Sequence, residues 1–141
     1  MAGPELAVCD DDGPGKISAR IDVAGARITA DEPIEHGGGG TGPSPHQLLA
    51  AALSACTAMT LRLYADRKGW PLAHAHVEVE HRREEGVAPQ DLFFRRVRLE
   101  GPLDPAQKER LIEIAQRCPV HRTLVAGSRI ETVEAAEGLA G

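Results

Sequence analysis

The sequence has few aromatic residues, no surplus of positive charge and only three cysteines. Aromatic residues make up 3% of the 141 residues, so a core must be built mainly from Ala, Leu, Val and Ile, which favours an oligomer. The net charge of −5 argues against a nucleic-acid partner, because nucleic-acid-binding surfaces are basic. Three cysteines are too few for a secreted disulfide scaffold, and they favour a reducing cytoplasm.

The sequence also shows no membrane or export signal. We find no apolar run of the roughly 20 residues that span a bilayer. Residues 1–16 lack the order of a signal peptide, a cationic segment followed by an apolar one. We therefore expect a cytoplasmic protein with no membrane partner. We predict one domain over residues 1–141, with a mobile N-terminus at residues 1–15 and a loose tail at residues 134–141.

Alternating apolar residues and helix caps predict an α+β fold with the element order β-β-α-β-β-α-β. The second helix is predicted to begin after Asp104, with Gln107 completing a capping box. Its apolar face continues to Cys118. The predicted strands cover residues 16–23, 27–30, 73–81, 93–101 and 128–133.

The central helix, predicted over residues 45–68, is the clearest element of the sequence. Ser44 is placed as N-cap, Gln47 completes a capping box, and Gly69 is placed as the left-handed end. No charged residue interrupts it before Arg62, and apolar stripes cover most of its surface. We expect such a helix to be covered from several directions, and a length of roughly 35 Å suits packing against a partner subunit.

Several motifs could indicate ligand sites, but each fits a simpler interpretation better. Gly37, Gly39 and Gly42 formally fit GxGxxG, yet the preceding stretch is charged and contains proline, so we interpret residues 31–45 as a flexible loop rather than a nucleotide site. The pair Cys118 and His121 lacks the second pair that a structural zinc needs. We predict no metal and no cofactor. Four polar residues alternate along one strand, where we expect a solvated face rather than a metal site: His74, His76, Glu78 and Glu80.

The three cysteines differ in their surroundings. Cys9 stands beside three aspartates, which disfavour a thiolate, and we expect it to be inert. Cys56 lies in the middle of the central helix, where a small buried residue is the simplest interpretation. Cys118 precedes Pro119, which should end one helix and begin another, so Cys118 would be an N-cap. At that position backbone N–H groups stabilise a thiolate, and both a reactive and a buried thiol remain open.

Two segments together resemble the OsmC/Ohr family of peroxide-reducing proteins, most closely its OsmC-like branch. They are GPSPHQLLAAALSACTAMTLRLYADRKGW at residues 42–70 and RLIEIAQRCPVHRTL at residues 110–124. The resemblance extends from about Lys16 to Val133 and implies an OsmC-like fold, assembled as an intertwined homodimer with its active sites at the subunit interface.

The resemblance also implies a role for two thiols. Cys56 would be the peroxidatic cysteine, and Cys118 would resolve its sulfenic acid to a disulfide, which a lipoyl-type dithiol then reduces. Organic hydroperoxides are the implied substrates, with hydrogen peroxide as a further candidate. Four residues of the central helix are candidates for an apolar substrate pocket, or else for core packing: Leu49, Leu53, Met59 and Leu63.

One departure from the family pattern concerns thiolate activation. Family members commonly carry a Glu ten residues before the peroxidatic cysteine, paired with an Arg, and here that position is His46. Arg20 and Arg27 are the candidates for the Arg. The departure supports an alternative function, an OsmC-like domain without efficient peroxidase activity that binds a small ligand or acts as a slow redox sensor. A third alternative is a metal held by Cys118, His121 and a neighbouring chain.

Overall fold

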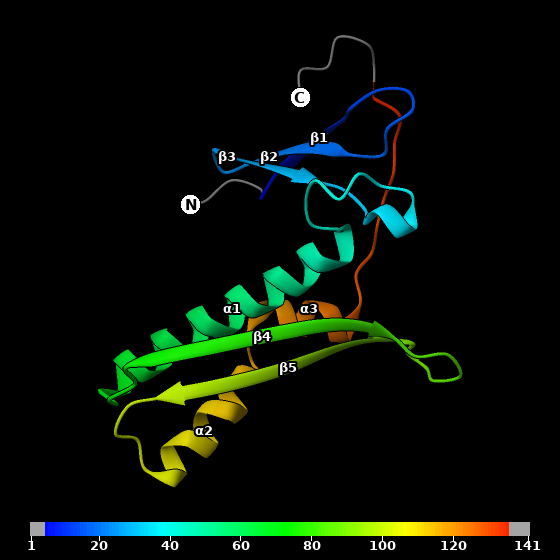
Figure 1. Ribbon diagram of the computed structural model, residues 1–141. Coiled ribbons are helices and arrows are strands. Elements are labelled where there is room, and N and C mark those ends of the chain that lie inside the picture. The colour runs from blue at the N-terminus through cyan, green and yellow to red at the C-terminus, as the bar shows by residue number, and fades with distance from the viewer. Residues whose placement is uncertain (1–4, 136–141) are drawn as a thin grey trace. The chain divides into compact units, whose positions relative to one another are not determined.

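The computed structural model describes residues 5–135. The chain divides into two units, residues 1–48 with 131–141, and residues 49–130. The helix α1 begins in the first unit and continues through the second. In chain order the elements are β1 (Ala7–Asp11), β2 (Ala19–Val23), β3 (Ala26–Ala30), η1 (Ile34–His36), α1 (Pro45–Lys68), β4 (His74–Arg83), β5 (Asp91–Glu100), α2 (Pro105–Ala115) and α3 (Pro119–Ala126) (Figure 1).

The first unit contains an antiparallel sheet in the order β1-β2-β3. A two-residue turn joins β2 to β3, and both of its residues have positive φ, 49° at Ala24 and 81° at Gly25, as a tight hairpin turn requires. The strand β1 pairs with β2, placing Cys9 opposite Ile21. Part of the N-terminal segment for which we predicted mobility therefore belongs to a sheet.

The glycine-rich loop after β3 is organised by the carboxylate of Asp31, which is 4% exposed. Asp31 accepts hydrogen bonds from the backbone N–H groups of Glu32, Gly39 and Thr41 at 2.8, 3.1 and 3.1 Å, and from the Thr41 hydroxyl at 2.6 Å. The bonds from Thr41 are the main reason that the pKa of Asp31 is lowered. The stretch predicted to be a flexible loop is thus held by one buried acid.

The caps predicted for α1 are confirmed. The Ser44 hydroxyl accepts from the Gln47 N–H at 3.2 Å, and the Gln47 side chain accepts from the Ser44 N–H at 2.8 Å. Gly69 follows the last helical residue with φ of +68°.

Within one chain, only one stripe of α1 is covered. Met59 and Leu63 are 66% and 59% exposed. Within the single chain, the other elements of the second unit pack against one side of α1, and cover from a partner subunit stays a prediction. The buried residues of α1 are Ala50, Leu53, Thr57, Leu61 and Ala65.

The helix α1 corrects the expectation that no apolar segment of the chain is long enough to span a bilayer. By length and composition alone, α1 is long and apolar enough to cross a membrane. A helix of this kind also occurs in the centre of a folded domain, and α1 contributes Leu61 and Ala65 to the main apolar core. It is the core helix of this fold.

In the second unit α1 and α2 pack against one face of the β4–β5 hairpin (Figure 1). The hairpin is antiparallel, with Val77 opposite Val97. As predicted, apolar side chains alternate with charged ones along both strands. The core holds seven buried residues: Leu61, Ala65, Leu72, Leu103, Leu111, Ile114 and Ala115.

The helix α2 begins as the sequence predicted. Asp104 is its N-cap, and Gln107 completes a capping box in both directions. Its predicted apolar face is buried at Leu111, Ile114 and Cys118.

The α+β class is confirmed, but the element order differs at the two ends of the chain. The strand β1 is additional, and residues 128–133, predicted as the last strand, are not a strand. Ile130 and Val133 are 88% and 87% exposed, and no described residue pairs with this segment. A strand needs a hydrogen-bonded neighbour, and none is supplied here. The tail predicted at residues 134–141 lies mostly outside the described residues.

Leu111 is 0% exposed, and we expect Leu111→Ala to lower the free energy of unfolding because it leaves a cavity in the core. The expected loss is about 2–5 kcal/mol. Ile112, on the same helix and 43% exposed, is the matched control, and Ile112→Ala should cost much less. Urea unfolding at one protein concentration measures both. Equal losses would show that the assigned core is wrong.

Candidate functional site

Cys118 is the N-cap of α3, as predicted from the proline that follows it. Its backbone is extended, with φ of −65° and ψ of 144°, and its Sγ atom accepts a hydrogen bond from the backbone N–H of His121 at 3.4 Å. The residue is 0% exposed. The sulfur therefore lies at the positive end of the dipole of α3 and accepts one of its first N–H groups.

The helix α1 places Thr57 against this thiol. The Thr57 Oγ1 atom lies 3.8 Å from Cys118 Sγ, and its hydroxyl donates to the carbonyl of Leu53 at 2.7 Å. Thr57 is 0% exposed, whereas Cys56, the preceding residue, is half-buried. Thr57 was not among the predicted site residues, although it lies four residues from both Leu53 and Leu61 and so belongs to the buried stripe.

The third member of the group is Arg95 of β5. Its Nη1 donates to Thr57 Oγ1 at 3.0 Å, and its Nη2 donates to His121 Nδ1 at 3.1 Å. Arg95 was also not among the predicted site residues. The sequence did contain a sign of its role, because Arg95 has the same strand phase as Val97 and Leu99, which places a cation on the apolar face.

His121 is held in its neutral form. Partial burial, and then the positive charge of Arg95, lower the pKa of its imidazole. Since Nδ1 accepts from Arg95, the ring proton of the neutral form is on Nε2. At neutral pH the site therefore contains one fixed cation, one neutral imidazole and one hydroxyl beside the sulfur of Cys118.

A pocket of about 560 Å³ opens beside Arg95 and His121. Of the residues predicted to line a substrate pocket, Leu53 lines this one. Leu49, Met59 and Leu63 do not, and neither cysteine does. The lining is mostly apolar and consists of Leu53, Pro89, Asp91, Leu92, Phe93, Arg95, His121, Leu124 and Val125.

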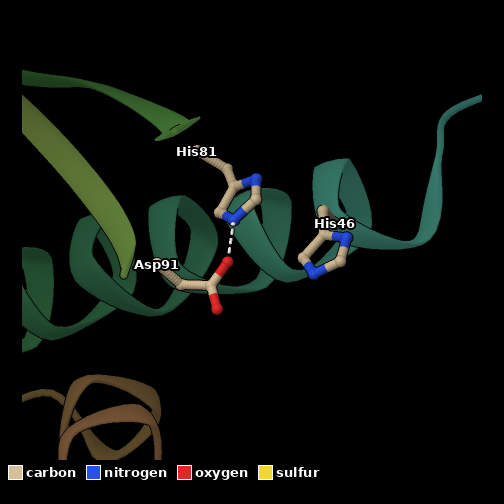
Figure 2. Close-up of side chains that lie close together, drawn as sticks. All are labelled: His46, His81 and Asp91. Carbon is tan, nitrogen blue, oxygen red and sulfur yellow. Dashed lines mark hydrogen bonds and ion pairs between the residues drawn. The ribbon is translucent and has the colours of Figure 1, made fainter. Parts of the chain in front are cut away.

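Figure 2 shows the imidazole of His81 on β4 directed at the carboxylate of Asp91 on β5. Their Nε2 and Oδ1 atoms are 2.8 Å apart, and this bond is the main reason that the pKa of Asp91 is lowered. His46, also drawn in Figure 2, is an exposed residue on the first turn of α1 and belongs to the first unit. Because His46 belongs to a different unit from His81 and Asp91, we assign no metal site to these three side chains.

The strand β4 carries the polar face that the sequence predicted. His76 Nε2 lies 3.7 Å from Glu78 Oε1, and both are substantially exposed. Within residues 5–135, the four polar residues of the predicted face belong to no group of three metal-ligating side chains: His74, His76, Glu78 and Glu80. In the predicted Cys118 and His121 pair, the Nδ1 atom of His121 already accepts a hydrogen bond from Arg95.

The remaining residues with a predicted role lie in the first unit. Arg20 Nε is 3.5 Å from Asp12 Oδ1, and Arg27 Nε is 3.0 Å from Asp22 Oδ1. Each arginine is thus paired with an aspartate within its own unit. The support that we expected them or His46 to give to Cys56 stays a prediction, as does the inertness of Cys9, which is exposed on β1.

The comparisons with known proteins concern both sequence and fold. The model of the family described as OsmC-like protein matches residues 37–133. No curated protein matches the chain in sequence.

Several solved structures share the fold. A putative osmotic stress induced and detoxification response protein from Psychrobacter arcticus is 20% identical, with a TM-score of 0.70 over 87% of this chain and 90% of its own. An OsmC like protein from Mycoplasma pneumoniae is 21% identical, with a TM-score of 0.70 over 89% of each chain. The organic hydroperoxide resistance protein OhrB of Bacillus subtilis is 19% identical, with a TM-score of 0.60 over 84% of this chain and 89% of its own.

At these identities the solved structures establish the fold, and the family model establishes descent over most of the chain, including both Cys56 and Cys118. The resemblance seen in the sequence is confirmed. The solved structures that share its fold include organic hydroperoxide resistance proteins. The chain belongs to the OsmC family.

Proposed function

We propose that the protein is a thiol-dependent peroxidase that reduces organic hydroperoxides, with Cys56 as the peroxidatic and Cys118 as the resolving cysteine. The observation that carries the proposal is the 3.8 Å contact between Thr57 Oγ1 and Cys118 Sγ. Because Cys56 precedes Thr57 on α1, this contact brings the helix that bears one thiol against the helix cap that bears the other. Membership of the OsmC family supports the same assignment.

The reaction would proceed in three steps. The Cys56 thiolate attacks the terminal oxygen of the hydroperoxide, the O–O bond breaks, and the alkoxide leaves and takes a proton to become an alcohol. Cys118 then attacks the sulfenic sulfur of Cys56, which releases water and forms a disulfide. A dithiol of the lipoyl type would return both cysteines to thiols and would itself become a disulfide.

The pocket beside Arg95 supports an organic rather than an inorganic peroxide. Its volume of about 560 Å³ and its leucine, phenylalanine and valine walls suit a hydrocarbon group. Arg95 and His121 supply the polar end, and both belong to the group around Cys118. Hydrogen peroxide would gain nothing from the apolar walls and should be the poorer substrate.

We further propose that the functional form is a homodimer in the cytoplasm. One side of α1 exposes Met59 and Leu63, at 66% and 59%, and residues 128–133 expose Ile130 and Val133. Large exposed apolar side chains on a central helix mark an interaction surface. A second copy of the chain is the partner that the family resemblance implies.

Replacing Cys56 should abolish turnover. We expect Cys56→Ser to lose essentially all consumption of cumene hydroperoxide with dihydrolipoamide as reductant, because serine has no thiolate to attack the O–O bond. Cys118→Ser should permit one round of peroxide reduction and then stop at the sulfenic acid, which a dimedone adduct on Cys56 would reveal. Cys9→Ser, the matched control, should keep wild-type turnover. Full activity in Cys56→Ser would contradict the proposal.

A charge on the exposed side of α1 should dissociate the dimer. Met59→Glu places a carboxylate in the proposed interface, and burying an unpaired charge costs several kcal/mol. Sedimentation velocity should show a dimer for the wild type and a monomer for this variant. Val87→Glu is the control, because Val87 is 53% exposed in the loop between β4 and β5. A monomeric wild type, or a dimeric Met59→Glu variant, would contradict the assignment.

A second function has one observation in its favour. Neither cysteine lines the pocket, so the pocket could serve a bound ligand without thiol chemistry. The chain would then be a small-ligand binder. Turnover by the wild-type protein separates the two functions, because a small-ligand binder would consume no cumene hydroperoxide, whereas a peroxidase would consume it in a way that Cys56→Ser abolishes.

A further inference from the structure

Thr57 connects the charge of Arg95 to the Cys118 thiol. Its Oγ1 atom accepts from Arg95 Nη1 at 3.0 Å and lies 3.8 Å from Cys118 Sγ. Its single hydroxyl proton is directed to the Leu53 carbonyl at 2.7 Å. In this arrangement the thiol proton of Cys118 is the one that lies between sulfur and Oγ1.

Loss of that thiol proton would reverse the direction of the hydrogen bond. When Cys118 is a thiolate, the Thr57 hydroxyl can rotate away from Leu53 and donate to sulfur, while Oγ1 still accepts from Arg95. The thiolate would then have two donors, this hydroxyl and the backbone N–H of His121, which already lies 3.4 Å from Sγ. Hydrogen bonds to a charged group are stronger than those to its neutral form.

The charge of Arg95 is not neutralised by an acid. Its hydrogen-bond partners, Thr57 and His121, are both uncharged, and among residues 5–135 no carboxylate forms an ion pair with it. Asp91 lines the same pocket but is bound to His81 and Arg83. The half-buried guanidinium therefore favours negative charge on a nearby group, and the thiol of Cys118 is one hydroxyl away.

The two sulfurs differ in their polar surroundings. Cys118 Sγ lies 3.8 Å from Thr57 Oγ1 and 3.4 Å from the backbone nitrogen of His121. In thiol–disulfide exchange the sulfur that is better stabilised as a thiolate leaves faster. These contacts therefore favour Cys118 as the leaving sulfur.

We propose that Thr57 and Arg95 are positioning residues that make Cys118 the leaving group when the oxidised protein is reduced, so that the reductant attacks Cys56. The inference rests on the proposed function, because it requires a Cys56–Cys118 disulfide.

The proposed step conserves atoms and electrons. A thiolate of the reducing dithiol attacks Cys56 Sγ, a new S–S bond forms between them, and the Cys56–Cys118 bond breaks. Cys118 leaves with the electron pair as a thiolate that accepts from Thr57 and from the His121 N–H. The second thiolate of the dithiol then attacks its own partner sulfur in the mixed disulfide and releases the Cys56 thiolate. The dithiol loses two electrons, the protein gains two, and solvent supplies the protons.

The direction of attack can be read from a trapped mixed disulfide. Full-length Cys9→Ser protein is oxidised with diamide, exposed briefly to 2-mercaptoethanol, quenched with acid, alkylated and mapped by peptide mass. We expect mercaptoethanol on Cys56 and the alkyl group on Cys118. The reverse pattern, or equal labelling of the two sites, would overturn the inference and leave the proposed peroxidase intact. If diamide forms no Cys56–Cys118 disulfide, the proposed function and this inference both fail.

A matched pair of variants separates a positioning role of Thr57 from a packing role. Thr57→Val keeps the shape and loses the hydroxyl, whereas Thr57→Ser keeps the hydroxyl and leaves a small cavity. We expect reduction of the disulfide by dihydrolipoamide to be about tenfold slower in Thr57→Val and within about twofold of wild type in Thr57→Ser. A packing role predicts the opposite order, with Thr57→Ser the more impaired, and that result would overturn the proposal. Equal rates in both variants and the wild type would overturn it as well.

Discussion

The hydrogen bond from Arg95 to Thr57 fixes the relation between α1, the hairpin and the thiol of Cys118. A half-buried guanidinium needs polar partners, and on the apolar face of β5 its hydrogen-bond partners are the Thr57 hydroxyl and the His121 ring. The hydrogen bond to Thr57 sets which face of α1 points at the hairpin. It also sets the position of Cys56, one residue before Thr57. The chemistry of the site is therefore a consequence of satisfying one half-buried cation.

The second constraint is the scarcity of aromatic residues in the chain. With aromatic residues at 3%, the core of the second unit depends on leucine, isoleucine and alanine from α1, α2 and the hairpin. That core covers one stripe of α1 and leaves Met59 and Leu63 exposed. A helix of this composition gains stability when a second surface covers it, which is why we place a homodimer, rather than the monomer, at the centre of the proposed function.

Local signals in the sequence predicted the parts of the fold that depend on neighbouring residues. The caps at Ser44 and Asp104, and the N-cap position of Cys118, each depend on a few consecutive residues, and the structure confirms all three. The strand β1 and the absence of a strand at residues 128–133 could not be predicted in this way. Each depends on whether the edge of another strand is available for pairing.

The site likewise combines residues that local motifs predicted with residues that only packing brings together. Cys56 and Cys118 could be selected from motifs, but Thr57, Arg95 and His121 come from three elements, and only packing brings them together. Arg95 was detectable in principle, as a cation in phase with Val97 and Leu99. The role of Asp31 in organising the glycine-rich loop is likewise non-local, because it depends on Gly39 and Thr41, eight and ten residues away.

The central claim is that Cys56 and Cys118 form one redox pair, and intact-mass analysis with peptide mapping tests it most directly. Reduced protein is treated with one equivalent of cumene hydroperoxide, and the thiols that remain are alkylated. The account predicts the loss of two thiols per chain and a single cross-linked peptide joining Cys56 to Cys118, with Cys9 alkylated. Thiols left intact by the peroxide, or a disulfide that includes Cys9, would contradict it.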